Sequence, residues 1–363
     1  MKLWEGKNEW FVWWAGLVGL TLIYWLKITA SPNLQTTFDS EQYIALAQKL
    51  MYGSSWWQSG QINAYGQVFV PYAPAYPVCI SVVSFITGLS AIWASKWVGY
   101  ACLIGLFRVV GSSNPGMLLP CWILLVSDAT MHIFTHTWAE GLMITGFVLC
   151  VLRYNQHFAI TLLAGVTAIC CRSAAAVGGL GLLTSSVFTR TGSRNLNIII
   201  IIGLGLLIQY IGYEGTHSSL FTGGVREAAI TGWSLIDLLR VVGQSLAVFK
   251  MTDGANSIAV HFCQGLVFFS FLRYVSKSDY QNNHHISLTL LTGGLFYLAL
   301  SMVTTQFYVL AEGLDVRLFY PGALLATIGI FHTRKFTALK TTHNLVIMAA
   351  ITLLHLPWRW LLG

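Results

Sequence analysis

Two carboxylates lie close together in the run Phe38-Asp39-Ser40-Glu41-Gln42-Tyr43, shortly after the first apolar stretch of the chain. Apolar residues then recur every three or four positions, which predicts a short amphipathic helix from Asp39 to Met51. A carboxylate there would lie beside water and near lipid, where it can accept a proton from a substrate hydroxyl group. The structural alternative is that Asp39 caps the helix and Glu41 adds favourable charge to its first turn.

Four ionisable residues recur at a spacing of four: Asp128, His132, His136 and Glu140. On one continuous helix they would form a polar stripe, and ionisable side chains at membrane depth usually line functional cavities. Imidazole and carboxylate groups also bind zinc or manganese, so Asp128, His132 and His136 are candidate metal ligands. The alternative is a solvated helix end, because the topology below requires an external turn in this stretch.

Two arginines are candidate phosphate ligands. Arg172 stands alone between two apolar runs, and Arg317 follows Asp315 directly before an apolar helix. A guanidinium group binds phosphate through paired, charge-assisted hydrogen bonds. The alternatives are that Arg172 extends along lipid to the outer interface and that Arg317 pairs with Asp315 in an exposed loop.

The elements that must position these residues are membrane helices. The chain has 363 residues, of which 55% are hydrophobic and 9% charged, and its mean hydropathy is +0.66. Soluble domains carry about 25% charged residues, so this chain lacks the polar surface of a water-soluble globule. Long apolar runs such as 196–211 and 286–300 predict helices, and the alternating strands of a membrane barrel are not seen.

The remaining composition argues against two other classes of site. The net charge of +7 comes from Lys and Arg residues scattered among short loops, which do not form the dense basic patch that binds nucleic acid. The seven cysteines lie in apolar segments without the spacing of metal ligands or of a disulfide framework. We therefore expect an all-α, polytopic membrane bundle of about 10–12 helices.

One transmembrane domain is expected over residues 1–363. Residues 31–75 would form an external loop that carries the amphipathic helix, residues 76–342 the helical core, and residues 343–363 a C-terminal helix. Two lysines, Lys2 and Lys7, precede the first apolar stretch, so the N-terminus is expected in the cytoplasm of a multi-pass cell-membrane protein.

Clusters of positive charge predict the cytoplasmic loops: Arg153/His157, Arg190/Arg194, Arg273/Lys277 and Arg334/Lys335/Lys340. Residues around 129–138, 172, 214–250 and 309–317 are then external. Three apolar segments, 77–92, 95–110 and 115–128, separate the external loops 31–75 and 129–138. Two loops on the same side of a membrane must be joined by an even number of crossings. One of the three segments must be re-entrant, interfacial or fused to its neighbour.

Taken in order, these pieces resemble the GT-C superfamily of polytopic membrane glycosyltransferases. The resemblance covers residues 38 to about 325. It rests on the acidic start Phe38 to Ala47, the Tyr- and Pro-rich stretch Tyr72 to Pro77, the acidic helix start in His136 to Leu142, the lone arginine in Cys171-Arg172-Ser173, and the late run Asp315 to Pro321. One departure is Pro74-Ala75, where the family usually has Pro-Gly or Pro-Leu.

The resemblance implies an enzyme that transfers a sugar from a polyprenyl-phosphate-linked donor to a glycan, glycolipid or protein acceptor. The transfer would take place on the extracytoplasmic face, with inversion at the anomeric carbon. Asp39 would be the catalytic base. The substrate-binding residues would be Glu41, Tyr43, Glu140, Arg172, Asp315 and Arg317. Some members of the superfamily use a divalent metal and others do not, so no cofactor is assigned.

Two other classes of protein fit parts of the same sequence. A transporter or lipid flippase accounts for the helices and the intramembrane polar residues, but not for an acidic surface helix at the front of the chain. A glycan polymerase or ligase shares lipid-linked substrates, but those proteins usually have large late external loops rich in Arg and His. The 214–250 loop holds only His217, Arg226 and Arg240 of these types.

Overall fold

The structure is a computed structural model, and it describes most of the chain. The described residues are 7–53, 73–113, 115–153, 157–172, 175–176, 179, 198–208, 234–246, 257–280, 284–307, 316–332, 334–336 and 341–355.

The described residues are helical almost throughout, which confirms the predicted helical class. The elements in the N-terminal half are α1 (Lys7–Thr29), α2 (Phe38–Met51), α3 (Ala75–Thr87), α4 (Ala91–Ser113), the 3-10 turn η1 (Pro115–Met117), α5 (Leu118–Val126), α6 (Asp128–Thr135), α7 (Glu140–Arg153) and α8 (Phe158–Cys171). The later elements are α11 (Leu235–Leu246), α12 (Ser257–Val275), β1 (Ser276–Tyr280), α13 (His284–Phe307), α14 (Val316–His332), β2 (Arg334–Phe336) and α15 (Thr341–His355). The two short strands were not predicted.

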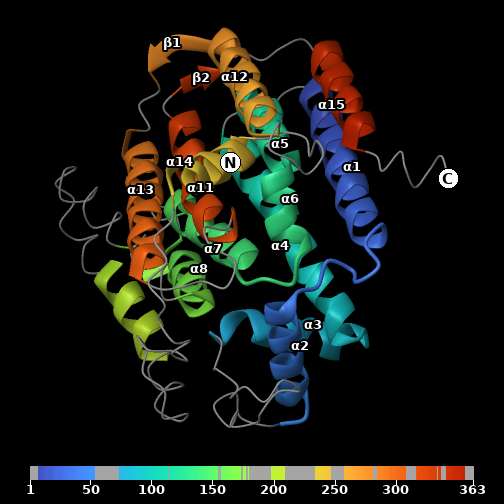
Figure 1. Ribbon diagram of the computed structural model, residues 1–363, viewed down its shortest axis with the longest axis vertical. Coiled ribbons are helices and arrows are strands. Elements are labelled where there is room, and N and C mark those ends of the chain that lie inside the picture. Colours follow the sequence, from blue (N-terminus) through green and yellow to red (C-terminus); the bar gives the residue numbers. More distant parts are fainter. Residues whose placement is uncertain are drawn as a thin grey trace.

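Helix α1 is the one described helix that is by itself long and apolar enough to cross a membrane, over Trp10–Thr29. Twenty residues at 1.5 Å per residue cover about 30 Å, the thickness of a bilayer's hydrocarbon core. The helix lies beside α15 (Figure 1) and also packs against α5. There the indole of Trp122 donates a hydrogen bond of 2.8 Å to the carbonyl of Gly16.

Two further candidate spans are bent pairs of helices. Helices α3 and α4 meet at 109°, and α5 and α6 meet at 67°. Helix α3 ends at Thr87, and Gly88 after it has a left-handed backbone (φ 70°), the usual conformation after a helix end. Its 13 residues cover about 20 Å, which is less than the hydrocarbon core requires. The segment predicted over 77–92 is therefore a short helix turned sharply against the next one.

The amphipathic helix predicted from Asp39 to Met51 is confirmed as α2. Its buried face packs against α3 and α4 rather than lying free on a surface. Tyr43 of that face makes an edge-to-face contact with Tyr76 of α3 at 5.3 Å between ring centroids. The structural alternative in which Asp39 caps the helix is wrong, because the N-cap is Thr37, whose hydroxyl accepts a hydrogen bond from the Ser40 amide. Asp39 and Glu41 do place acidic charge in the first turn, as that alternative also proposed.

The C-terminal half contains the tightest helix pair. Helices α13 and α14 lie side by side and approach closely at Gly294 and Gly322, where a Cβ atom on either glycine would meet the backbone of the other helix within 2.8 Å. Small residues at helix contacts are typical of membrane helix pairs.

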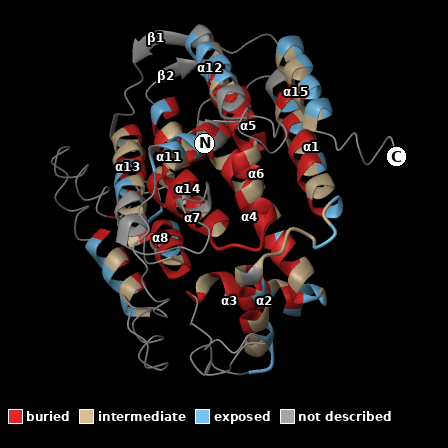
Figure 2. Ribbon diagram, viewed as in Figure 1, coloured by how far each residue is buried: buried red, intermediate tan, exposed pale blue. Residues whose placement is uncertain are grey.

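Strands β1 and β2 form an antiparallel ribbon with Ser276 opposite Phe336 and Lys277 opposite Lys335. The ribbon brings two of the predicted positive clusters to the same end of the molecule (Figure 1). The loop predicted over 214–250 requires a correction, since residues 235–246 form α11. Buried residues concentrate in the middle of the molecule, and all nine residues of α5 are buried (Figure 2).

Candidate functional site

Of the two interpretations of the Asp128–Glu140 stretch, the continuous polar stripe is wrong, and a turn interrupts the helix. Helix α6 ends at Thr135, His136 has an extended backbone, and a new helix begins at Glu140. Ser127 begins α6 as its N-cap, because its hydroxyl accepts a hydrogen bond from the Thr130 amide. The spacing of four therefore crosses a turn, and Glu140 lies on a different helix from Asp128 and His132.

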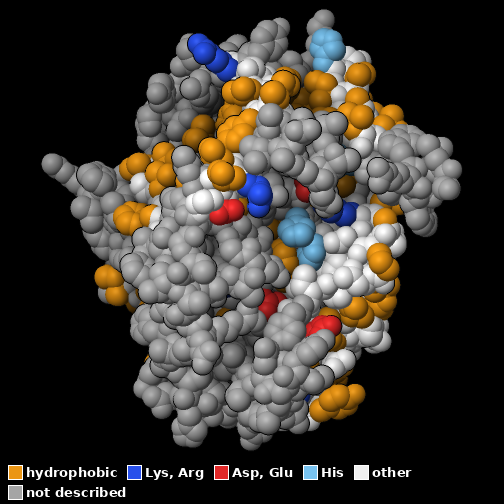
Figure 3. Space-filling view, in the orientation of Figure 1, with side chains coloured by type: hydrophobic (Ala, Val, Ile, Leu, Met, Phe, Trp, Pro, Cys, Tyr) orange, Lys and Arg blue, Asp and Glu red, His pale blue; other side chains and the backbone are white. Residues whose placement is uncertain are grey.

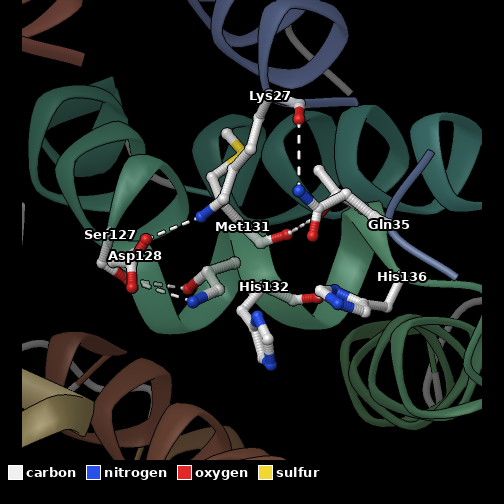
Figure 4. A network of polar contacts seen from close by, with 9 residues as sticks. Lys27, Gln35, Ser127, Asp128, Met131, His132 and His136 are labelled. Atoms are coloured by element: carbon white, nitrogen blue, oxygen red, sulfur yellow. Dashed lines mark hydrogen bonds and ion pairs between the residues drawn. The ribbon is translucent and has the colours of Figure 1, made fainter. Parts of the chain in front are cut away.

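Three aromatic rings pack together at the end of α6. The ring centroids of His132 and His136 are 4.1 Å apart, and His136 stacks on Trp138 at 4.4 Å. Burial lowers the pKa of His136 to about 3, and the neighbouring His132 contributes to the same shift. The His136 ring is therefore neutral at neutral pH. Figure 4 shows His132 projecting from α6 away from Lys27.

The candidate metal ligands do not gather into a site. Asp128 pairs with Lys27 of α1 through a contact of 2.6 Å between Nζ and Oδ1 (Figure 4). Within the part of the chain that the structure describes, no three His, Cys, Asp or Glu side chains are placed to hold a metal ion. Asp128 therefore forms an ion pair with Lys27, and the rings of His132 and His136 pack against each other.

The turn after α6 contacts the start of α2. The indole nitrogen of Trp138 donates a hydrogen bond of 2.9 Å to the hydroxyl of Thr37, the N-cap of α2. Asp39 lies in the first turn of that helix and is partly exposed, and Glu41 is exposed beside it. Tyr43, by contrast, is buried in the packing of α2 against α3. Asp39 and Glu41 are thus accessible, and Tyr43 is part of the core.

Glu140 and Arg172 form an ion pair that joins the start of α7 to the end of α8. The side chain of Glu140 is fully buried, whereas 26% of the Arg172 side chain is exposed. A guanidinium group has five N–H donors, so one edge can bind Glu140 while another faces outward. The predicted lone arginine is therefore a residue oriented by a buried carboxylate.

The late predicted motif is described only in part. Asp315 lies outside the described residues, and Arg317 is in the first turn of α14, where its side chain is not described. One turn further on, the hydroxyl of Tyr320 lies 2.6 Å from Thr130 Oγ1 and 3.2 Å from Ser127 Oγ. These contacts hold the first part of α14 against the bend between α5 and α6.

One residue at this site was missed from the sequence. Lys96 of α4 is fully buried, and its ammonium group donates hydrogen bonds to the turns on both sides of the Thr37–Trp138 contact. An ionisable residue inside an apolar run was the available signal, because such residues rarely lie in a membrane helix without a role.

Together these contacts gather Asp39, Glu140 and Arg172 into one region, which we call the junction. We define it as the first turn of α2, the 135–140 turn and the end of α8. Figure 3 shows histidine side chains near the middle of one face, with both basic and acidic side chains around them. The junction offers partly exposed carboxylates and a partly exposed guanidinium group, and this combination can bind a hydroxyl group and a phosphate group.

Comparison with known proteins adds no further assignment. No protein-family model matches the chain, and no curated protein or solved structure is significantly similar to it. The resemblance to the GT-C superfamily therefore rests on the sequence motifs alone.

Proposed function

We propose that the protein is a membrane glycosyltransferase that moves a sugar from a polyprenyl-phosphate-linked donor to a polar acceptor at the extracytoplasmic face. The observation that carries this proposal is the junction itself. Thr37 and Trp138, 101 residues apart in sequence, are hydrogen-bonded, and the Glu140–Arg172 pair continues from there. The acidic first loop, the acidic second turn and the lone arginine of the sequence motifs are therefore adjacent in space.

In the proposed reaction the Asp39 carboxylate acts as the general base. It takes the proton from an acceptor hydroxyl group while that oxygen forms a bond to the anomeric carbon of the sugar. The bond between the anomeric carbon and the phosphate oxygen breaks, and the lipid phosphate leaves with the bonding electrons. General-base assistance of this kind contributes about 10²–10⁴-fold in rate. The partial exposure of Asp39 at the start of α2 supports this role.

Arg172 would stabilise the charge that develops on the leaving lipid phosphate. A fixed guanidinium group near developing negative charge lowers the barrier because it needs no reorganisation during the reaction. Glu140 is fully buried, so it would act through Arg172 by holding the guanidinium group in place. Arg317 is a second candidate cation from the sequence motif.

The topology that fits this function has α2 outside and the ribbon of β1 and β2 in the cytoplasm. Helices α3 and α4, which are bent by 109°, would together form one broken span, so the segment 77–92 would be fused to its neighbour. Two crossings, the α3–α4 pair and the α5–α6 pair, would then join the external loop 31–75 to the turn that follows Thr135. This assignment would satisfy the even number of crossings that the sequence requires.

The function is tested with the purified full chain in lipid vesicles that contain polyprenyl-phosphate-linked sugars and free sugar or glycan acceptors. The expected result is release of polyprenyl phosphate together with a glycosylated product of inverted anomeric configuration. Transfer of intact donor lipid between leaflets without cleavage of the sugar–phosphate bond would instead identify a flippase and contradict the proposal.

A further inference from the structure

A lysine inside the bundle connects the two turns that form the junction. Lys96 lies in α4 and is fully buried. Its Nζ atom donates hydrogen bonds to the Thr135 carbonyl at 2.9 Å, the Thr137 hydroxyl at 2.9 Å and the Gln35 carbonyl at 3.3 Å. An ammonium group has three N–H donors, so these three neutral oxygens use all of them.

The first of the two turns leads into α2 and has an unusual backbone. Leu34 and Gln35 both have positive φ angles, 53° and 56°, in a conformation that residues other than glycine adopt at a cost of about 1–3 kcal/mol. The side chain of Gln35 also donates a hydrogen bond of 3.3 Å to the backbone carbonyl of Lys27 (Figure 4). Such a conformation persists only where its surroundings hold it, and the ammonium group of Lys96 is one of the groups that hold it.

The second turn carries the remaining groups of the junction. Thr137 accepts from Lys96 and also lies 2.8 Å from the hydroxyl of Ser95, the preceding residue of α4. The next residue, Trp138, makes the hydrogen bond to Thr37, and Glu140 follows two positions later. The ammonium group of Lys96 therefore contacts the backbones of both turns, and the contact between these turns brings Asp39 near Glu140.

We infer that Lys96 is a positioning residue: its ammonium group fastens the 31–37 turn to the 135–137 turn and so fixes the first turn of α2 relative to the start of α7. Burying a charge is costly unless it is fully hydrogen-bonded, and an apolar side chain would fill this place at a lower cost. Because Lys96 is fully buried, it does not touch a substrate. The effect of Lys96 on catalysis rests on the proposed function, whereas its structural role does not.

The structural test uses the full chain with a cysteine reporter at Ser40, which is fully buried in the first turn of α2. The exposed Cys263 is replaced by serine so that it does not react. The rate of maleimide labelling of Ser40→Cys is then compared with and without Lys96→Met. We expect at least about a tenfold faster rate in Lys96→Met, because hydrogen bonds from a charged donor change an equilibrium by roughly ten- to a hundredfold.

The matched control is Tyr24→Phe, which removes a buried hydroxyl bound to the Lys96 carbonyl and the Phe134 carbonyl but leaves the ammonium contacts intact. Its labelling rate is expected to stay within about twofold of the parent. Equal rates for the parent and a folded Lys96→Met, or equal increases in both variants, would overturn the inference. If Lys96→Met does not fold, Thr137→Val removes one acceptor alone and must still raise the rate several-fold.

A second readout concerns catalysis. In Lys96→Met, kcat for sugar transfer per folded molecule is expected to fall at least tenfold, while KM for the lipid donor stays within about twofold. A loss of folded protein alone would change neither value after this normalisation. Because the labelling result does not depend on any transfer activity, failure of the proposed function and failure of the inference about Lys96 give different results.

Discussion

The indole of Trp138 donates a hydrogen bond of 2.9 Å to the hydroxyl of Thr37, across 101 residues of sequence. Thr37 is also the N-cap of α2, so one hydroxyl group both begins that helix and attaches it to the turn before α7. Asp39 and Glu140 follow these two residues by two positions each. Their relative position therefore depends on the attachment of two helix starts and not on a direct bond between the carboxylates.

The two ion pairs of the region are expected to differ in their contribution to stability. Arg172→Gln leaves the fully buried Glu140 carboxylate without this cation, which should lower the free energy of unfolding by about 3–5 kcal/mol. Asp128→Asn affects a partly exposed pair with Lys27, and the expected loss is below about 1 kcal/mol. Chemical unfolding in detergent, followed by circular dichroism, measures both. Equal losses would show that the Glu140–Arg172 pair is not buried as described.

Arg172→Lys keeps the positive charge but loses the planar fork of donors. Transfer is expected to fall by about ten- to a hundredfold, because one charge-assisted hydrogen bond contributes about 1.5–3 kcal/mol and each 1.36 kcal/mol is tenfold in rate. The matched control is Arg153→Lys at the other end of α7, which should leave kcat unchanged. Full activity of Arg172→Lys would remove Arg172 from the site.

Gly99 and Gly105 on α4 provide a matched pair for the packing beneath the junction. A Cβ atom at Gly99 would collide with the Phe134 backbone carbonyl and lie 2.8 Å from the Tyr24 hydroxyl, so Gly99→Ala should destabilise the protein by about 1–3 kcal/mol. A Cβ atom at Gly105 meets only Thr145, at 3.9 Å, so Gly105→Ala should be neutral or stabilising by up to about 1 kcal/mol. Thermal unfolding of the two variants checks this order, and the reverse order would contradict the described contact of α4 with α6.

The proposed topology is tested by two exposed positions. Glu41→Cys in α2 should react with a membrane-impermeant maleimide from outside intact cells, whereas His157→Cys, before α8, should react only after permeabilisation. The exposed Cys263 is replaced by serine in both. Labelling of both positions from outside would contradict the orientation, because the positive cluster Arg153/His157 would then not be cytoplasmic.

The sequence predicts the elements of this fold better than their contacts. The apolar runs and the amphipathic spacing after Asp39 are local signals, and the helices lie close to where these signals put them. The end of α6 at Thr135 has no such signal, because no glycine or proline interrupts the spacing of four from Asp128 to Glu140. The spacing alone therefore could not decide between a continuous stripe and the turn that the topology required, and the structure has the turn.

Long-range partners could not be predicted at all. The sequence singles out Asp128 and Arg172 as unusual, but it does not show that Lys27 pairs with the first and Glu140 with the second. Lys96 was missed because its role consists entirely of contacts with turns about 40 and 60 residues away. Helix α11 was also missed, since a short amphipathic stretch within a predicted loop carries no hydrophobic run of spanning length.

Transfer by Asp39→Asn tests the central claim most directly. The measurement is sugar transfer from polyprenyl-phosphate-linked donor in vesicles, per folded molecule, with Glu41→Gln as the matched control because Glu41 is an exposed carboxylate in the same helical turn. We predict that Asp39→Asn lowers the rate by about 10²–10⁴-fold without changing folding or insertion, whereas Glu41→Gln lowers it far less. Transfer by Asp39→Asn at the parent rate would contradict the assignment of Asp39 as the base.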